Sequence, residues 1–384
     1  MAEPHRDSRE RAHGSVTDAV HDFDVPEIDL LSPIEIRGVT LPSRVAMSPM
    51  CQYSAREGLA NDWHLVHLGS RAAGGVALVM VEATAVTREG RITPGDLGLW
   101  EDEQLRALGR IVRFVHEQGA VAGIQLAHAG RKASCDVPWK GGARLGLQQG
   151  GWAVVAPSPI PFADGDPSPL PLDAAGIEGI KAAFEAAALR ALAAGFRVFE
   201  IHAAHGYLLH EFLSPIANER DDEYGGSLVN RMRLVLEVAA RVRRIVPESL
   251  PLFVRISATD WVEGGWGADD SVALARQLGE RGVDLIDVSS GGLVPKATIP
   301  VTKGYQVPFA RKIREEAEIF TGAVGMICEP EQADRIITSG DADLVFLARE
   351  LLREPYWAQK AARALDGEPR WPIQYGYALK RRQK

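Results

Sequence analysis

One alternation constrains the fold of this chain more than any other feature: helix-like segments end in glycine, and a short apolar run follows almost at once. Glycine adopts the left-handed cap at a helix C-terminus more easily than other residues, and continuous apolar runs suit strands that are covered on both faces. The glycines that mark the pattern are Gly75, Gly119, Gly195, Gly282 and Gly340. The chain is therefore expected to alternate helices with buried parallel strands.

The apolar runs predict eight strands. Between them lie helical segments, of which residues 101–118 have the clearest apolar stripe. Units of this kind can build a closed barrel or a doubly wound sheet. Polar residues follow nearly every run, as at the carboxyl ends of barrel strands, and this favours a single (β/α)8 TIM barrel. The predicted strands cover residues 45–50, 76–83, 121–127, 198–202, 252–257, 285–289, 319–324 and 344–348.

Further segments complete the predicted organisation. Residues 33–41 alternate apolar and polar side chains around a glycine, which predicts a hairpin that closes the barrel floor. The Gly- and Pro-rich residues 130–172 follow the third strand and predict an inserted hairpin or lid. We place the barrel domain at residues 28–375, after a disordered or helical extension (1–27) and before a short C-terminal tail (376–384).

Composition narrows the functional classes. The 384 residues include only three cysteines, too few and too scattered for a disulfide framework or a thiolate metal cluster, which favours a reducing cytoplasm. The formal charge of −8 argues against a nucleic-acid partner. No run approaches the roughly eighteen apolar residues of a membrane span, and the N-terminus lacks the apolar core of a secretory signal. A cytoplasmic protein without nucleic-acid or membrane partners is expected.

The fourth predicted strand ends in two histidines and a tyrosine that can share one cleft. His202 and His205 stand three residues apart, and Tyr207 follows. Two imidazoles so placed can hydrogen-bond a substrate oxygen and stabilise its developing negative charge, while the phenol serves as a general acid. Two other interpretations stay open: structural histidines bonded to the loop backbone, or a metal site completed by His128 or Glu200.

Two other places contain polar side chains that a ligand could use. Arg255 interrupts an apolar strand, and a buried guanidinium needs an anionic ligand or an internal partner such as Glu200 or Glu82. Residues 322–325 after the seventh strand and Arg349 after the eighth supply small residues and a positive charge. Barrels frequently bind phosphate at this place, so we predict a phosphate site there.

Together these segments resemble the old yellow enzyme family of FMN-dependent ene-reductases, specifically its thermophilic-like subclass. The resemblance extends over nearly the whole chain, and it rests on several motifs that occur in order, each at a strand end or in the loop that follows. These motifs are MSPMCQY (47–53), VEA (81–83), QLAHAGRK (125–132), HAAHGY (202–207), RDDEYGGS (220–227) and GAVG (322–325).

The resemblance implies a complete set of site residues. His202 and His205 would bind the substrate oxygen, Tyr207 would donate a proton, and Tyr53 would face the substrate. Cys51 would modulate the flavin potential and substrate binding rather than act as a nucleophile. No metal is implied. The FMN-binding residues would be Ser48, Pro49, Met50, Cys51, Ala83, Gln125 and Arg255 at the ring, with Gly325, Ala348 and Arg349 at the phosphate.

The implied reaction has two halves. NADPH or NADH reduces tightly bound FMN, and an α,β-unsaturated carbonyl or nitro compound then receives a hydride at its β-carbon and a proton at its α-carbon. Three rival interpretations are a dienoyl-CoA reductase, a metal-dependent barrel lyase and a non-catalytic flavin-binding protein. The first would require cluster-binding cysteines and further domains, which the sequence lacks.

One departure from the family pattern concerns assembly. Many members of the subclass have an arginine shortly after a C-terminal tyrosine, and this arginine reaches the neighbouring subunit's site. Here Tyr375 is followed by Gly376 and Tyr377. A homo-oligomer is expected, and whether Tyr377 replaces the arginine by stacking stays open. His67 also matches the family pattern, without a defined role.

Overall fold

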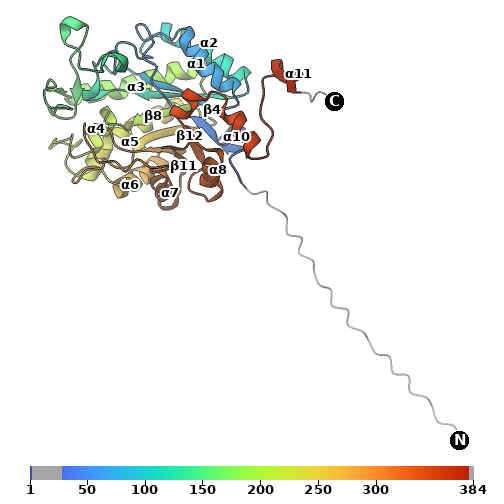
Figure 1. Cartoon of the computed structure of the whole chain (residues 1–384). Coiled ribbons are helices and arrows are strands. Elements are labelled where there is room, and N and C mark those ends of the chain that lie inside the picture. The colour runs from blue at the N-terminus through green and yellow to red at the C-terminus, as the bar shows by residue number, and fades with distance from the viewer. Residues whose placement is uncertain (2–27, 380–384) are drawn as a thin grey trace.

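The computed structural model describes Met1 and residues 28–379, and it shows a closed barrel of parallel strands inside a layer of helices (Figure 1). The predicted (β/α)8 barrel is thus confirmed, whereas residues 2–27 and 380–384 of the predicted tails lie outside the described residues. Around the barrel the order is β10-β11-β12-β3-β4-β5-β8-β9. These strands are β3 (Val45–Met47), β4 (Leu78–Ala85), β5 (Val121–Ala127), β8 (Val198–Ala203), β9 (Leu252–Ser257), β10 (Leu285–Ser289), β11 (Phe320–Ala323) and β12 (Leu344–Leu347).

Helices cover the outside of the barrel, and each predicted cap glycine lies at a positive φ between 73° and 93°. Buried apolar side chains of the helices pack against the outward-facing side chains of the strands and form the main core. The helices are α1 (Asp62–Ala73), α2 (Asp102–Glu117), α3 (Ala174–Ala194), α4 (Leu208–Leu213), α5 (Leu228–Ile245), α6 (Ala268–Gly279), α7 (Val307–Ala317), α8 (Pro330–Thr338), α9 (Arg349–Arg353), α10 (Trp357–Ala364) and α11 (Gly376–Leu379).

Side-chain alternation along the strands divides the barrel interior into layers. On β8, Val198 belongs to the apolar cluster at the floor, and Glu200 lies one layer higher. His202 stands in the layer closest to the mouth. The interior therefore changes from apolar to charged to imidazole along one strand, and this gradient places the polar chemistry at the carboxyl ends of the strands.

The predicted floor hairpin is confirmed. Strands β1 (Ile34–Ile36) and β2 (Val39–Leu41) pair in antiparallel register, with Ile36 opposite Val39. The apolar side chains of this hairpin are buried against Phe253 and other residues at the amino ends of the barrel strands. The hairpin thereby excludes water from the bottom of the barrel.

The insertion after β5 is irregular. Residues 130–172 contain three short 3-10 helices, and a two-residue strand β6 (Val155–Ala156) pairs in parallel with β7 (Leu170–Pro171). An antiparallel bridge joins Cys135 to Arg144. The predicted location of the insertion is correct, but β6 and β7 do not form the antiparallel hairpin that was one of the two expectations.

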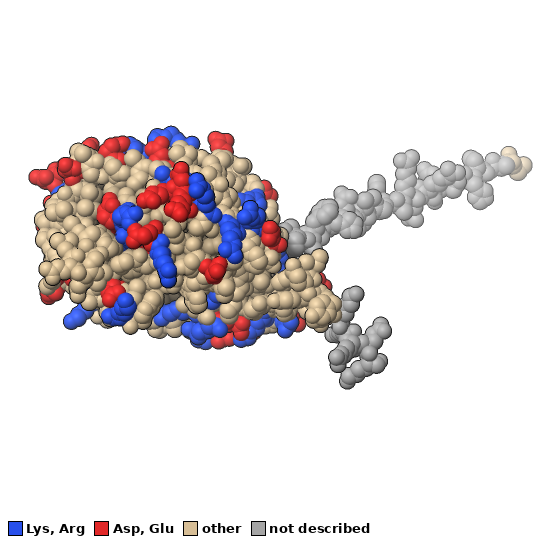
Figure 2. Space-filling view, turned by 90° about the horizontal axis from the view of Figure 1, so that it is seen from above, with Lys and Arg blue, Asp and Glu red and all other residues tan. Residues whose placement is uncertain are grey.

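The surface shows mixed charge. On the face shown in Figure 2, Lys and Arg side chains lie interleaved with Asp and Glu side chains. Among the described residues, no helix combines the length and the apolar character that a membrane crossing requires.

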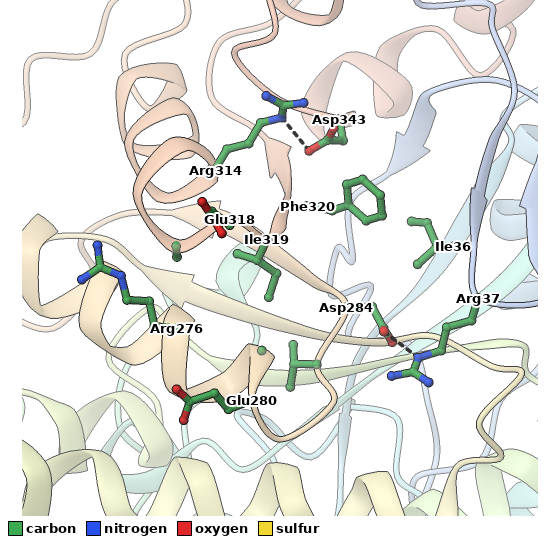
Figure 3. Close-up of a pocket in the computed structure, with 13 residues that line it drawn as sticks. Ile36, Arg37, Arg276, Glu280, Asp284, Arg314, Glu318, Ile319, Phe320 and Asp343 are labelled. Carbon is green, nitrogen blue, oxygen red and sulfur yellow. Dashed lines mark hydrogen bonds and ion pairs between the residues drawn. The ribbon is translucent and has the colours of Figure 1, made fainter.

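A large cavity lies at the floor, at the end of the barrel opposite the predicted site (Figure 3). It has a volume of about 730 Å³ and is bounded by α6, α7 and the amino ends of β10 and β11. Two of its arginines form ion pairs, Arg37 with Asp284 and Arg314 with Asp343. The guanidinium of Arg276 donates to the carbonyl oxygen of Glu316. The three arginines of this cavity are therefore already bonded to the protein.

Candidate active site

The turn after β8 brings the two predicted histidines together. The Nδ1 atom of His205 lies 3.4 Å from Nε2 of His202, and the two rings meet edge to face. The ring of Tyr207 also meets that of His202 edge to face, with centroids 5.0 Å apart. His202 is buried, while His205 and Tyr207 are partly exposed. The three side chains therefore form one group at the barrel mouth.

Neighbouring elements fix the backbone of this turn. His205 has φ of +59°, a left-handed conformation that side chains other than glycine adopt at some cost. Its N–H donates to Oγ of Ser257 at 2.9 Å, and its carbonyl oxygen accepts from Nζ of Lys132 at 2.8 Å. The N–H of Gly206 donates to Nδ1 of His210 at 2.9 Å. These supports compensate for the local strain.

The buried pair behind the turn was missed from the sequence. Nε2 of His210 lies 2.9 Å from Oδ1 of Asp260, and both side chains are fully buried. Asp260 also accepts from Ser214 Oγ and from the N–H of Trp266, and together these donors hold its pKa below the usual value. The pair therefore positions the imidazole that supports Gly206. Its only signal in the sequence was a third histidine, His210, close to the His-x-x-His motif.

Both histidines at the mouth are neutral. Burial first, and then the positive charge of Arg255, lower the pKa of His202 and of His205 well below the usual value. Nδ1 of His202 accepts from the N–H of Ala204 at 3.2 Å, so the neutral ring keeps its proton on Nε2, the atom that faces His205. Nε2 of His205 lies 2.7 Å from Oγ of Ser289. Each ring can therefore supply an N–H without a net charge.

The structure supplies no ligand set for the metal interpretation. Among the described residues, no three His, Cys, Asp or Glu side chains are arranged to hold a metal ion. Nδ1 of His128 accepts from the N–H of Gly130, and Glu200 accepts from Nε2 of Gln125. The two residues proposed to complete a metal site thus bond to the protein.

Arg255 pairs with a residue that the sequence interpretation did not include. Its Nε lies 3.3 Å from Oδ2 of Asp287, the residue opposite it in the register of β9 and β10. The suggested partner Glu82 instead pairs with His64 of α1, after a register shift in β4 turns it outward. Glu200 forms no ion pair with Arg255. The internal partners expected for Arg255 were therefore wrong, although an acidic residue within an apolar run was visible at position 287.

The end of β3 supplies the next predicted residues. Ser48 is buried, and its Oγ has no hydrogen-bond partner among the described residues. Pro49, Met50 and Cys51 follow and are partly exposed at the mouth. Burial raises the pKa of the Cys51 thiol well above its usual value, so this cysteine is protonated and is not a thiolate nucleophile. Tyr53 lies at φ of +50° on the same loop.

Two more predicted residues lie on adjacent strands. Ala83 and Gln125 are buried near the carboxyl ends of β4 and β5. The amide nitrogen of Gln125 donates to Glu200 at 2.7 Å. His67 lies on α1, where its buried Nε2 has no partner among the described residues and burial lowers its pKa to about 3. The predicted ring-contact residues thus come from neighbouring elements at one end of the barrel.

A cavity of about 270 Å³ lies at the predicted phosphate site. Its lining includes Gly325, Ala348 and Arg349, and also Ser289 and Gln306. Gly325 has φ of +117°, a conformation that favours glycine. Arg349 is exposed and forms no ion pair with a described residue. The predicted residues therefore line one hollow with an available positive charge.

A second cavity, of about 360 Å³, lies under the inserted segment. Tyr53 and Lys132 form the side nearest the histidine turn, and Phe162, Ile92 and Pro138 form apolar walls. Nζ of Lys132 donates to the carbonyl oxygens of His205 and Gly292, so this charge is already bonded to the protein. The sequence predicted only an inserted hairpin or lid and not this cavity, because the cavity forms from side chains far apart in the chain.

Comparisons with known proteins agree with this geometry. Residues 29–368 match the model of the NADH:flavin oxidoreductase / NADH oxidase family. The NADPH dehydrogenase of Geobacillus thermodenitrificans is 49% identical over 348 residues, which cover 90% of this chain and 97% of that protein. The NADPH dehydrogenase of Bacillus subtilis is 47% identical and covers 90% of this chain and 98% of that protein.

Solved structures show the same architecture. Morphinone reductase superposes with a TM-score of 0.73 at 26% identity, over 91% of this chain and 92% of that one. A 2-naphthoyl-CoA reductase has a TM-score of 0.80 at 23% identity and shares the fold; the match covers 88% of this chain and 52% of that longer protein. The chain is an oxidoreductase and belongs to the NADH:flavin oxidoreductase / NADH oxidase family, which is the old yellow enzyme family.

Proposed function

We propose that this enzyme reduces the C=C bond of α,β-unsaturated carbonyl or nitro compounds at the expense of NADPH or NADH. The observation that supports the proposal most directly is the pair of neutral imidazoles, His202 and His205, whose facing nitrogens lie 3.4 Å apart at the barrel mouth. In the structure the N–H of His202 faces His205, and Nε2 of His205 faces Ser289 Oγ; a substrate oxygen that enters this turn would accept hydrogen bonds from both imidazoles in place of these contacts, which suits an oxygen on which negative charge develops.

The residues at the mouth fit FMN. Ser48 Oγ is buried without a hydrogen-bond partner among the described residues, as expected of a group that awaits a polar ligand, and Arg255 supplies a buried positive charge whose Nε pairs with Asp287. The 270 Å³ cavity beside Arg349 suits the phosphate. We propose that the ring is bound by Ser48, Pro49, Met50, Cys51, Ala83, Gln125 and Arg255, and the phosphate by Gly325, Ala348 and Arg349.

Bound FMN supplies a hydride carrier that NADPH or NADH can load. The protein's own residues then orient and activate the substrate. His202 and His205 donate hydrogen bonds to its carbonyl or nitro oxygen, which makes the β-carbon electrophilic. Tyr53, on the loop after β3, packs against the substrate, and the neutral thiol of Cys51 contributes a polarizable surface.

Tyr207 is the proposed proton donor. Burial raises the pKa of Tyr207 well above its usual value, so the phenol keeps its proton at neutral pH. Its ring lies against His202, and Nζ of Lys132 lies 5.2 Å from the ring centroid. A nearby ammonium stabilises the phenolate that remains after proton transfer to the α-carbon of the substrate.

The cavity under the inserted segment accommodates the rest of the substrate. Its cations are bonded within the protein: Lys132 bonds to two carbonyl oxygens, and Arg144 lies 3.1 Å from Asp166. The one other acid in the lining, Asp136, accepts a hydrogen bond from the N–H of Val137. A group that enters this cavity therefore meets Phe162 and other apolar walls and no unpaired cation of the lining. We propose that the preferred substrates carry a neutral apolar substituent at this side.

The C-terminal segment is the proposed contact between subunits of a homo-oligomer. The side chains of Ile373 and Tyr377 are 90% and 82% exposed. Large apolar side chains so exposed are typical of interaction surfaces. Cys51, Cys135 and Cys328 are free thiols, which agrees with the proposed location in a reducing cytoplasm.

Anaerobic reduction followed by reoxidation tests the proposed function. We expect purified holoprotein to be yellow, to bleach with NADPH and to regain colour on addition of cyclohexenone. Colourless protein with stoichiometric zinc would identify a metal-dependent lyase instead. Yellow protein whose reduced form no enone or maleimide reoxidises would identify a flavin-binding protein without this activity.

A double substitution tests the imidazole pair. His202→Ala with His205→Ala removes two hydrogen-bond donors, each worth about 3 kcal/mol in comparable sites, so enone turnover should fall at least a hundredfold while FMN stays bound. The matched control is His116→Ala. His116 lies in the last turn of α2, and its ring contacts only the backbone carbonyl oxygens of Ala120 and Gly195. Turnover that survives the double substitution would remove the pair from the mechanism.

A further inference from the structure

Three ionisable side chains share the barrel interior one layer below the mouth. Glu200 and Asp287 are fully buried and Arg255 is 5% exposed. They come from the neighbouring strands β8, β9 and β10, and Arg255 stands opposite Asp287 in register. One cation thus faces two carboxyl groups, and the trio would have a net charge of −1 if every group were ionised.

The contacts within the trio do not stabilise two carboxylates. Arg255 Nε lies 3.3 Å from Asp287 Oδ2, and Gln125 donates one hydrogen bond to Glu200 Oε1. The remaining oxygens, Glu200 Oε2 and Asp287 Oδ1, have no hydrogen-bond partner among the described residues. A buried carboxylate without a partner costs several kcal/mol, and a bound proton removes that penalty.

The surroundings supply no second cation to the trio. His202 and His205, from β8 and the turn after it, are neutral, and Gln125 of β5 is uncharged. Strands β3, β11 and β12 contain no titratable side chain, and the single acid of β4, Glu82, faces His64 instead. Lys132, above the turn, is the nearest other cation and bonds to backbone carbonyls.

The pKa values of both carboxyl groups are raised, in agreement with this geometry. Burial, followed by the charge of Asp287, raises the pKa of Glu200 to about 8. Burial also raises the pKa of Asp287 to about 6, against the opposing effect of Arg255. The two carboxyl groups titrate as a pair, so near pH 7 the trio contains one proton and has a net charge close to zero.

We propose that Glu200, Arg255 and Asp287 form a proton-exchange site that takes up one proton from solvent when the flavin above it is reduced. This rests on the proposed function, in which NADPH transfers a hydride to neutral FMN and leaves as NADP⁺. A hydride comprises two electrons and one proton. The flavin then gains one negative charge, and the second carboxylate of the trio binds a solvent proton. The trio changes from 0 to +1 as the flavin changes from 0 to −1, so the buried region keeps its net charge.

Proton uptake during reduction tests the proposal directly. Holoenzyme in weakly buffered solution at pH 7 is reduced anaerobically with stoichiometric NADPH, and a pH-indicator dye reports the change. Hydride transfer itself consumes no solvent proton, so uptake reports protonation of the protein or of the reduced flavin, and a variant without the two carboxyl groups separates these sources. We expect close to one proton per flavin in the wild type and none in Glu200→Gln with Asp287→Asn, which leaves the trio no carboxyl group to bind it. Uptake that is absent from the wild type, or unchanged in this double variant, overturns the proposal.

Glu211→Gln is the matched control. Glu211 is another fully buried carboxyl group, and burial raises its pKa to about 8, but it lies on α4 beside Arg131 rather than on the barrel axis. We expect this variant to take up the same proton as the wild type. Loss of uptake in Glu211→Gln as well would show that the proton does not belong to the trio.

The flavin midpoint potential provides a measurement that does not need NADPH. For a two-electron couple, each proton taken up adds about 30 mV per pH unit to the slope of the midpoint potential against pH. We expect the wild-type slope between pH 6 and 8 to be steeper by about this amount than that of Glu200→Gln with Asp287→Asn. A wild-type slope as shallow as that of the variant contradicts the proton-exchange site. Failure of enones to reoxidise the flavin would contradict the proposed function while leaving this slope unaffected.

Discussion

The two ends of the barrel differ in how far their polar groups are satisfied. At the floor, apolar side chains of the β1–β2 hairpin fill the interior, and the arginines around the 730 Å³ cavity are paired or bonded to backbone (Figure 3). At the mouth, Ser48 Oγ and Glu200 Oε2 lack hydrogen-bond partners among the described residues, and Arg255 Nε forms only a 3.3 Å ion pair with Asp287. The mouth cavities are smaller, at about 270 and 360 Å³. Buried atoms without partners also occur at the floor, at Arg44 and Thr321, so the ionisable groups inside the barrel near the mouth, rather than volume, distinguish the candidate site.

Among substitutions at the two ends of the barrel, Arg255→Met at the mouth should have the largest effect on FMN binding and stability. The change leaves Glu200 and Asp287 without a cation, and breaking a buried pair in this way costs about 3–5 kcal/mol. We expect FMN retention to fall more than a hundredfold and the apoprotein to melt earlier. Equilibrium dialysis with FMN and thermal denaturation measure the two effects. A variant that binds FMN as the wild type does would show that the mouth does not depend on this charge.

Glu211, on α4 at the mouth side of the barrel, should make stability depend on pH. Burial raises the folded-state pKa of Glu211 to about 8 from the ordinary value of 4.5, so its contribution to stability is complete below pH 4.5 and is lost as the pH rises through 8. Glu211→Gln removes this loss, which is on the order of 3–4 kcal/mol between pH 5 and 8. Melting curves of the apoprotein at both pH values check this. Equal slopes for wild type and variant would contradict the assignment.

Arg349→Ala should weaken cofactor binding without weakening the fold. Arg349 is exposed and forms no ion pair with a described residue, so the apoprotein loses little. A charge-assisted hydrogen bond to phosphate is worth about 1.5–2 kcal/mol, which corresponds to roughly a tenfold to thirtyfold weaker FMN affinity. Fluorescence titration with FMN measures the effect, and riboflavin, which lacks the phosphate, is the control ligand. The same loss of affinity for riboflavin would argue against a phosphate contact.

Arg314→Met at the floor should have the smallest effect. Its partner Asp343 still accepts from the N–H of Thr321, and the Arg314 side chain is 38% exposed. Partly exposed ion pairs contribute about 0–1 kcal/mol, so the melting temperature should change by a few degrees at most. Turnover and FMN affinity should stay at the wild-type level. A large loss of activity would show that the floor cavity takes part in function and that the contrast between the two ends is incomplete.

The barrel itself could be predicted because its signals are local. A glycine at the end of a helix and an apolar run in a covered strand are properties of short segments, and all five cap glycines lie at positive φ. The histidine pair was equally accessible, since His202 and His205 share one turn.

The partners of these residues could not be predicted in the same way. Asp287 meets Arg255 only because barrel closure sets the register of β9 and β10. Ser257 and Ser289 reach His205 from the ends of two other strands. Such contacts depend on how strands align across the barrel, and no single segment encodes that alignment. An acidic residue inside an apolar run was the one visible clue, at position 287.

The left-handed backbone of His205 has a consequence for engineering. Glycine or asparagine at this position would relieve strain of about 1 kcal/mol or more. Selection for heat resistance alone would therefore favour replacing this histidine. Under the proposed mechanism, a screen that scores only melting temperature would collect stable, coloured, inactive variants. A useful screen for this scaffold has to measure turnover in every round.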